Sequence, residues 1–184
     1  MPLHRSPTVR YDYSDYLSIP ESHSRHEILD GELVVTPTPR VNHQVVAFEL
    51  TRLLREIAGA NDLGEALGPI TVHLRDDLVL EPDIVFVRRK RMSIVDPEGH
   101  VHGPPDVVVE VLSPTTRDYD RSLKRKRCLE EGVGEVWIVD IDARLVEVWR
   151  AGSSEPEPST GTLRWHVGDD AFDIPLVEVF RGVR

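Results

Sequence analysis

Two carboxylates stand inside segments that otherwise carry mostly hydrocarbon side chains. Glu110 lies in DVVVEVLSP, among four valines and a leucine, and Asp83 opens the apolar run of EPDIVFV. An ionised carboxylate in an apolar interior costs several kcal/mol unless a cation, a metal ion or hydrogen-bond donors compensate it. The sequence therefore predicts that Glu110 has a partner from elsewhere in the chain.

The alternation of side chains along strands favours a metal site for these two acids. Asp83 begins one predicted buried strand, and Glu110 lies in the middle of another. If the two strands pair, the carboxylates can converge, and with a nearby backbone carbonyl, that of Val111, they form hard oxygen ligands suited to Mg²⁺ or Mn²⁺. The alternative for Glu110 is a structural glutamate at a strand end that pairs with an arginine.

A lysine that follows the Glu110 strand is the candidate cation. Asp120, Lys124 and Cys128 recur every four residues, so they share one face of the helix predicted from about Asp118 to Glu131. From that face Lys124 can reach back to the sheet, where it could neutralise developing charge. The alternative is that the run RSLKRKR is a solvated basic surface.

The first half of the chain predicts a hairpin followed by a helix. Asp30-Gly31 favours the positive backbone angles of a tight turn between strands at 26–29 and 32–36. Apolar residues then recur at helical spacing in an amphipathic helix, for which Asn42 is the expected cap and Gly59 the end.

The remaining elements alternate between strands and one helix. Strand patterns occur in ITVHL, LVLEPDIVFV and DVVVEVL, and EVWIVD and LVEVWR form a predicted hairpin after the second helix. The order strand, helix, strand indicates a crossover. Residues 151–162 are expected to be flexible, and the segment after them resembles short closing strands.

Composition limits the size and setting of the protein. The 184 residues, 40% of them hydrophobic, suit one compact domain over residues 1–184. A single cysteine and the lack of about 18 consecutive apolar residues predict a soluble, cytoplasmic protein with no intramolecular disulfide and no membrane span. The net charge of -10 argues against a general polyanion binder, so nucleic-acid contact would depend on local basic clusters.

Four motifs together give the chain a family resemblance over nearly its whole length. They are RHEILDGELVVTPTP followed by His43, EPDIVFV, DVVVEVLSPTTRDYDRSLK and GVGEVWIVDID. The sequence resembles the Uma-type "putative restriction endonuclease" family of the PD-(D/E)xK nuclease superfamily. The resemblance implies an α/β fold with a restriction-endonuclease-like mixed β-sheet core, flanked by helices and extended by additional β-hairpins.

The resemblance also implies roles for particular residues. Asp83 and Glu110 match the two acids that bind the metal ion, and Glu27 matches a further family acid that helps to hold it. The usual lysine of the superfamily stands two residues after the second acid, where this sequence has Leu112. The resemblance implies that Lys124 replaces it from the following helix.

His43 and Asp120 are secondary candidates for the site, and the sequence differs from the family pattern at two positions. His43 matches a family position, although a histidine there is also typical of a helix cap or a packed polar residue. Asp120 is a candidate because it shares the face of Lys124. Cys128 and Val136 stand where the family commonly has an aromatic residue, and neither departure removes a proposed ligand.

These observations predict an endonuclease dependent on Mg²⁺ or Mn²⁺ that hydrolyses phosphodiester bonds of DNA. A homodimer is expected because cutting both strands with one site per chain favours paired protomers. The rival functions are a noncatalytic nucleic-acid-binding or assembly module and a small-molecule metallohydrolase, which would need a closed apolar pocket. The candidate phosphate contacts are Arg88, Arg89, Arg117, Arg121, Arg125 and Lys126.

Overall fold

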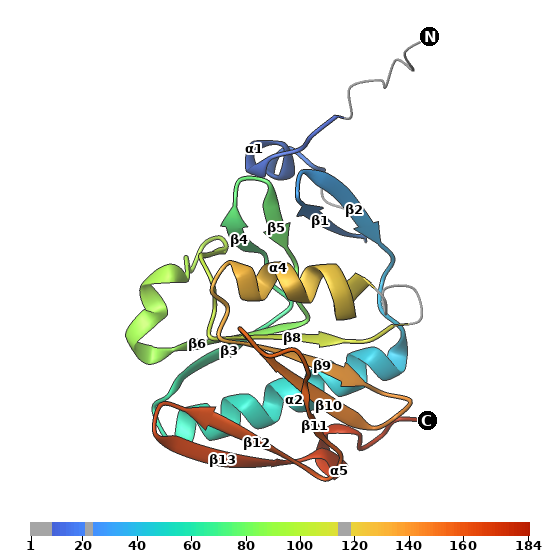
Figure 1. The fold of residues 1–184 in the computed structure, drawn as a ribbon, viewed down its shortest axis with the longest axis vertical. Helices are drawn as coiled ribbons and strands as arrows, with labels where there is room; N and C mark the ends of the chain where they lie inside the picture. The colour runs from blue at the N-terminus through green and yellow to red at the C-terminus, as the bar shows by residue number, and fades with distance from the viewer. Residues whose placement is uncertain (1–8, 21–23, 114–118) are drawn as a thin grey trace.

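The computed structural model of the chain describes residues 9–20, 24–113 and 119–184, whose fold is drawn in Figure 1. The helices are α1 (Tyr13–Leu17), α2 (Val41–Ala60), α4 (Arg125–Glu130) and α5 (Leu176–Val179), with a 3-10 turn η1 (Arg89–Ile94) and a π-helical turn η2 (Asp120–Lys124). The strands are β1 (Arg25–Leu29), β2 (Glu32–Thr36), β3 (Gly64–Leu67), β4 (Val72–Arg75), β5 (Leu78–Leu80), β6 (Ile84–Arg88), β7 (Val101–His102), β8 (Val107–Val111), β9 (Glu135–Asp140), β10 (Leu145–Arg150), β11 (Glu157–Ser159), β12 (Thr162–Val167) and β13 (Asp170–Pro175). The predicted mixed sheet core, flanked by helices and extended by hairpins, is confirmed.

The central sheet, sheet B, has the strand order β11-β10-β9-β8-β6-β3. All five residues of β8 are buried, and the strand lies between antiparallel β6 and parallel β9. Parallel neighbours require a crossover connection, which η2 and α4 supply here. The structure therefore confirms the predicted central strand and the predicted crossover.

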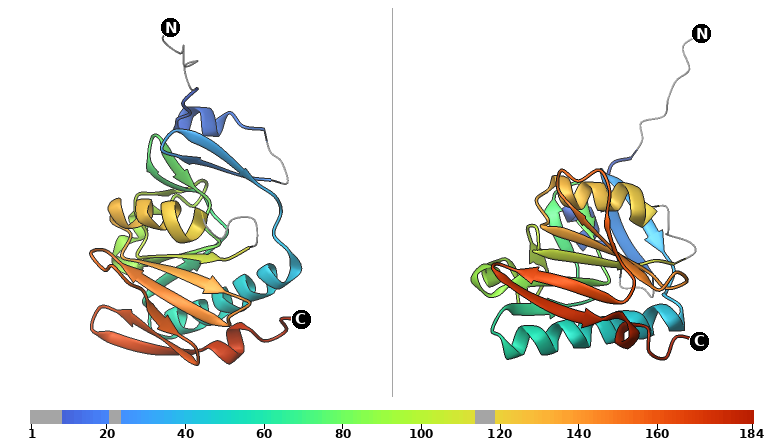
Figure 2. Two further views of the ribbon diagram at one scale, coloured as in Figure 1. Left: turned by 45° about the vertical axis from the view of Figure 1, so that its right-hand side comes forward. Right: turned by 60° about the horizontal axis from the view of Figure 1, so that its bottom comes forward.

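Helices cover the two faces of sheet B, as the right-hand view of Figure 2 shows. On one face, Val109 of β8 and Leu50 of α2 belong to the same hydrophobic core cluster. Residues of the β12–β13 hairpin and of α5 are also part of this cluster. On the other face Val108 of β8 shares a cluster with Cys128 of α4. Because side chains alternate along a strand, Glu110 lies on the α4 face together with Val108.

A second sheet, sheet A, places the first hairpin beside the central sheet. Its strand order is β2-β1-β5-β4-β7. The predicted hairpin is confirmed, since Asp30 and Gly31 at its turn have φ values of 50° and 79°. Strand β1 also pairs with β5, which leads through a short irregular segment into β6. Glu27 of β1 is thereby carried to the start of β6.

Two local predictions were wrong. Asn42 does not cap α2: the cap position is Arg40, without a side-chain bond, and the Asn42 side chain donates to the carbonyl of Arg184 at 2.7 Å. Residues 151–162 are not simply a flexible stretch, because β11 within them pairs with β10.

Several further elements differ from the expectation. The sequence patterns gave no indication of α1, β3, β7 and α5. The start of the second helix, expected near Asp118, lies outside the described residues. Among the residues that the structure does describe, no helix is both long and apolar enough to cross a membrane.

Gly68, the residue after β3, tests how closely the chain at the end of β3 approaches the start of its partner strand β6. A Cβ atom at Gly68 would lie 2.2 Å from the carbonyl oxygen of Asp83 and 2.9 Å from Cα of Ile84. Because both atoms belong to the backbone, we expect Gly68→Ala to lower the free energy of unfolding by about 1–3 kcal/mol.

The matched control is Gly59→Ala in α2, where an added Cβ meets nothing within 4 Å. We expect this change to be neutral or to stabilise the protein by up to about 1 kcal/mol, because alanine restricts the unfolded chain. Chemical denaturation of both variants measures the difference. Equal stability of the two variants would contradict the packing of β3 on β6.

Candidate active site

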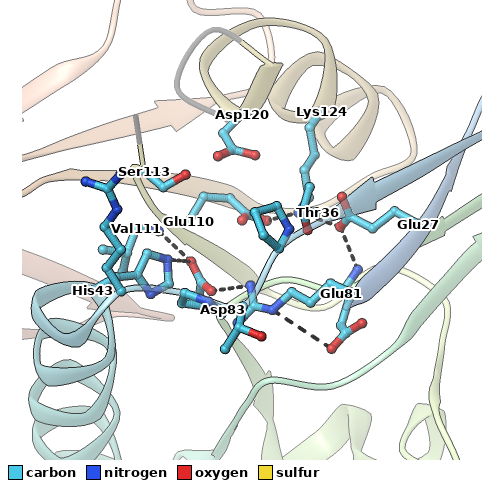
Figure 3. Close-up of a pocket in the computed structure, with 15 residues that line it drawn as sticks. Glu27, Thr36, His43, Glu81, Asp83, Glu110, Val111, Ser113, Asp120 and Lys124 are labelled. Atoms are coloured by element: carbon cyan, nitrogen blue, oxygen red, sulfur yellow. Dashed lines mark hydrogen bonds and ion pairs between the residues drawn. The ribbon is translucent and has the colours of Figure 1, made fainter. Parts of the chain in front are cut away.

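A cavity of about 230 Å³ opens where the start of β6 and the end of β8 meet β1 and η2. Figure 3 shows that the side chains of Glu27, Glu110 and Lys124 point toward one another from three of these elements. The residues that line it are Arg25, Glu27, Thr36, Pro37, Thr38, Pro39, Arg40, His43, Glu81, Asp83, Glu110, Val111, Ser113, Asp120 and Lys124. The structure thus brings together every residue that the sequence analysis proposed as catalytic, metal-binding or secondary.

Asp83 is held on both of its carboxylate oxygens. Arg25 Nη1 lies 2.5 Å from Oδ1, while the Val111 backbone N–H donates to Oδ2 at 2.8 Å and His43 Nε2 lies 3.1 Å from the same oxygen. Burial by itself raises the pKa of Asp83, but these partners lower it to about 2. Asp83 is therefore an ionised carboxylate in the buried wall of the cavity.

Lys124 is the partner that Glu110 required. Its Nζ atom lies 2.7 Å from Glu110 Oε1 and 2.6 Å from Glu27 Oε1, and all three side chains are buried. In Figure 3 the lysine reaches from the helix toward both acids. Burial lowers the pKa of Lys124, but the surrounding carboxylates outweigh it and raise that pKa well above its usual value. Glu110 therefore pairs with a lysine and not with the arginine of the alternative interpretation. The arginine of the cavity that pairs with an acid is Arg25, and its partner is Asp83.

The helix after β8 has the predicted orientation. Asp120, Lys124 and Cys128 are all buried, whereas the Lys126 side chain is 63% exposed and lies 3.8 Å from Glu130. The π-helical turn that ends at Lys124 leads directly into α4. The buried face of this helix therefore carries Lys124 into the cavity and leaves Lys126 on the surface.

The cavity contains more negative than positive charge. Five carboxylates and three permanent cations line it, a formal excess of two negative charges with His43 neutral. Burial and neighbouring acids such as Asp120 raise the pKa of Glu110 well above its usual value, although Lys124 opposes the shift. The excess and the oxygen donors of Asp83 and Glu110 fit a hard divalent cation.

The acidic side chains of the cavity do not have the geometry of a preformed metal site. Among the described residues, no group of three or more histidine, cysteine, aspartate or glutamate side chains is placed to hold a metal ion. Arg25 and Lys124 occupy carboxylate oxygens instead. A metal ion would have to compete with these cations for its ligands.

The predicted nucleic-acid contacts lie outside the cavity wherever the structure describes them. Arg117 is not among the described residues. Arg125 stacks on Trp149, with its Cζ atom 3.6 Å from the ring centroid. The other four form ion pairs within the chain: Arg88 with Asp106, Arg89 with Asp62, Arg121 with Asp140, and Lys126 with Glu130.

Sequence reasoning missed three charged residues of the cavity: Arg25, Arg40 and Glu81. Arg25 is the first residue of RHEILDGELVVTPTP and Glu81 the first of EPDIVFV, while Arg40 directly follows TPTP. Their place in or next to these motifs was the signal that could have found them.

The comparisons first identify the class of fold. A solved structure, described as that of a "putative nuclease belonging to DUF820 from Anabaena variabilis ATCC 29413", is similar to this chain with a TM-score of 0.75 and 19% identity. The similarity covers 91% of this chain and 96% of the other, so the predicted restriction-endonuclease-like fold is confirmed. A comparison with curated proteins finds no match.

A family model also matches most of the chain. The model of the Uma2 family, described as "Putative restriction endonuclease", matches residues 13–172. The chain belongs to this family, which confirms the resemblance seen in the four motifs.

The low pKa of Asp83 predicts a component of acid stability. Its pKa of about 2 in the folded protein is below the ordinary value of 3.8, so ionised Asp83 stabilises the fold above pH 3.8. This contribution, about 2 kcal/mol from the difference in pKa, is lost as the pH falls toward 2.

The measurement is the free energy of unfolding between pH 5 and pH 2 in the presence of a chelator. We expect the stability of Asp83→Asn to fall less steeply with pH than that of the wild type, because the amide does not titrate. Parallel curves would show that the partners of Asp83 do not lower its pKa.

Proposed function

We propose that the protein is a metal-dependent endonuclease that hydrolyses phosphodiester bonds of DNA. The observation that carries the proposal is the cavity with an excess of negative charge, in which Glu110 and Glu27 hold the ammonium group of Lys124 and ionised Asp83 lies in the same wall. The family description, which names a restriction endonuclease, supports DNA as the substrate.

Asp83 and Glu110, with the carbonyl of Val111 and the carboxylate of Glu27, would hold Mg²⁺ or Mn²⁺. These are hard oxygen donors of the kind that both ions prefer. When bound, such an ion polarises the phosphate and lowers the pKa of a water molecule. Asp83 suits the role because its pKa of about 2 keeps it ionised at neutral pH.

Lys124 would supply the positive charge that the chain itself contributes to the reaction. Its pKa is raised well above the usual value, so it remains protonated at neutral pH. An ammonium group fixed between Glu110 and Glu27 can orient the attacking water or stabilise the charge that develops on the phosphate. Its burial in the cavity wall limits competition from bulk water.

Plasmid cleavage tests the catalytic assignment. We expect wild-type protein to cut DNA with Mg²⁺ or Mn²⁺, and Asp83→Asn, Glu110→Gln and Lys124→Gln each to lower turnover by about 10² or more. Lys90→Met is the matched control, because Lys90 is exposed outside the cavity. Circular dichroism and a chelator control accompany each assay.

Two outcomes would contradict the catalytic proposal. Cleavage by Lys124→Gln at the wild-type rate would remove Lys124 from the mechanism. Binding of DNA without any metal-dependent cleavage by folded wild-type protein would favour the noncatalytic module instead.

We further propose that the protein acts as a cytoplasmic homodimer. Cys128 is a free, buried thiol, which suits a reducing compartment. On the outer face of α2, Val41 and Phe48 are seven residues apart and exposed, Phe48 by 67%, and Val177 of neighbouring α5 is exposed as well. Exposed apolar side chains that gather on one surface are typical of association sites.

Light scattering of the purified protein at micromolar concentration tests the dimer. We expect a mass about twice 20.8 kDa for the wild type and a shift toward 20.8 kDa for Phe48→Ser, which places a polar side chain in the proposed contact. A wild-type mass near 20.8 kDa would contradict the dimer, and an unchanged mass for Phe48→Ser would contradict this interface.

A further inference from the structure

Arg25 occupies one oxygen of the acid that the proposed function assigns to the metal ion. Its Nη1 atom lies 2.5 Å from Asp83 Oδ1, and the arginine side chain is only 17% exposed. A guanidinium group and a metal ion use the same lone pairs of a carboxylate and repel each other as like charges. Arg25 and a metal ion therefore compete for Oδ1.

The other partners of Asp83 are less free to leave. The Val111 N–H belongs to the backbone of β8, and His43 is a buried side chain in the first turn of α2. Both hold Oδ2 and set the direction of the carboxylate. Arg25, on a long side chain with several rotatable bonds, is the partner that can move away without moving the backbone.

Glu81 offers Arg25 a second carboxylate. Its Oε1 atom lies 4.0 Å from Arg25 Nε, and its side chain also lines the cavity. Burial raises the pKa of Glu81, an effect that the charge of Arg25 opposes. A closer contact between the two would compensate a carboxylate that is now only weakly paired.

We propose that Arg25 is the resident counter-ion of Asp83 in the metal-free protein, that a divalent cation must displace it, and that Glu81 then receives its guanidinium group. The inference rests on the proposed function, since it assigns to Arg25 a positioning role toward that metal site. Arg25 would keep the buried carboxylate of Asp83 paired until the metal ion arrives, at the cost of weaker metal affinity.

Calorimetric titration with Mn²⁺ alone, without DNA, tests the competition. We expect Arg25→Gln to bind Mn²⁺ about tenfold more tightly than the wild type, equivalent to about 1.4 kcal/mol. Arg25→Lys should restore affinity to near the wild-type value, because it returns a cation to Asp83. Arg40→Gln is the matched control. It removes a cation from the same cavity, but Arg40 is not among the described partners of Asp83, which are Arg25, His43 and Val111.

The control separates displacement from a general effect of charge. An equal gain in affinity for Arg40→Gln and Arg25→Gln would overturn the inference, because any lost cation would then suffice. Equal Mn²⁺ affinities of the wild type and Arg25→Gln would overturn it as well, while leaving the metal site intact. No Mn²⁺ binding by either protein would instead remove the metal site, and the proposed function with it.

Glu81→Gln tests the second half of the proposal and remains informative if Arg25→Gln does not fold. We expect it to weaken Mn²⁺ binding severalfold, because the displaced guanidinium group loses its acceptor. In the double variant with Arg25→Gln, the effect of Glu81→Gln should largely disappear, since it acts through Arg25. An unchanged affinity for Glu81→Gln alone, or strict additivity in the double variant, would show that Glu81 does not receive Arg25.

Discussion

The burial of more carboxylates than cations in one cavity is the constraint on which the arrangement of the chain depends. Glu27 comes from β1, Glu110 from β8 and Lys124 from η2, and the single ammonium group of Lys124 joins all three elements. Each partner is needed, because a buried charge that loses its counter-ion destabilises a fold by about 3–5 kcal/mol. The first hairpin, the central strand and the crossover helix are thereby fixed to one another by electrostatics as well as by packing.

Packing of the hydrocarbon side chains determines where this polar cluster lies. The α2 face of sheet B is covered along its length by α2, the β12–β13 hairpin and α5, and it forms a continuous apolar core. The α4 face is covered by a shorter helix and by sheet A, and the cavity opens at the end of β8. Glu110 lies on this second face because of its position in the alternation of β8, between apolar neighbours that point the other way.

Periodicity predicted the parts of the site that depend on local geometry. Alternation along two strands brought Asp83 toward Glu110, and four-residue spacing on a helix placed Lys124 on one face with Asp120 and Cys128, because both rules act over a few residues. The pairing of Arg25 with Asp83 joins residues 58 positions apart and leaves no local pattern. The same reason explains why the basic clusters looked free in the sequence: the carboxylates that pair with Arg88 and Arg121, Asp106 and Asp140, are 18 and 19 positions away in the chain.

The stacking of Arg125 on Trp149 has a consequence for the tryptophan fluorescence of the protein in solution. Of its three tryptophans, Trp137 and Trp165 are buried in the core, whereas Trp149 is only partly covered and lies under the guanidinium group of the residue next to Lys124. A cation held 3.6 Å from an indole ring alters its emission, so the fluorescence of Trp149 depends on the position of the helix that carries the lysine. The chain therefore contains an intrinsic optical probe, Trp149, in contact with the residue that follows its proposed catalytic cation.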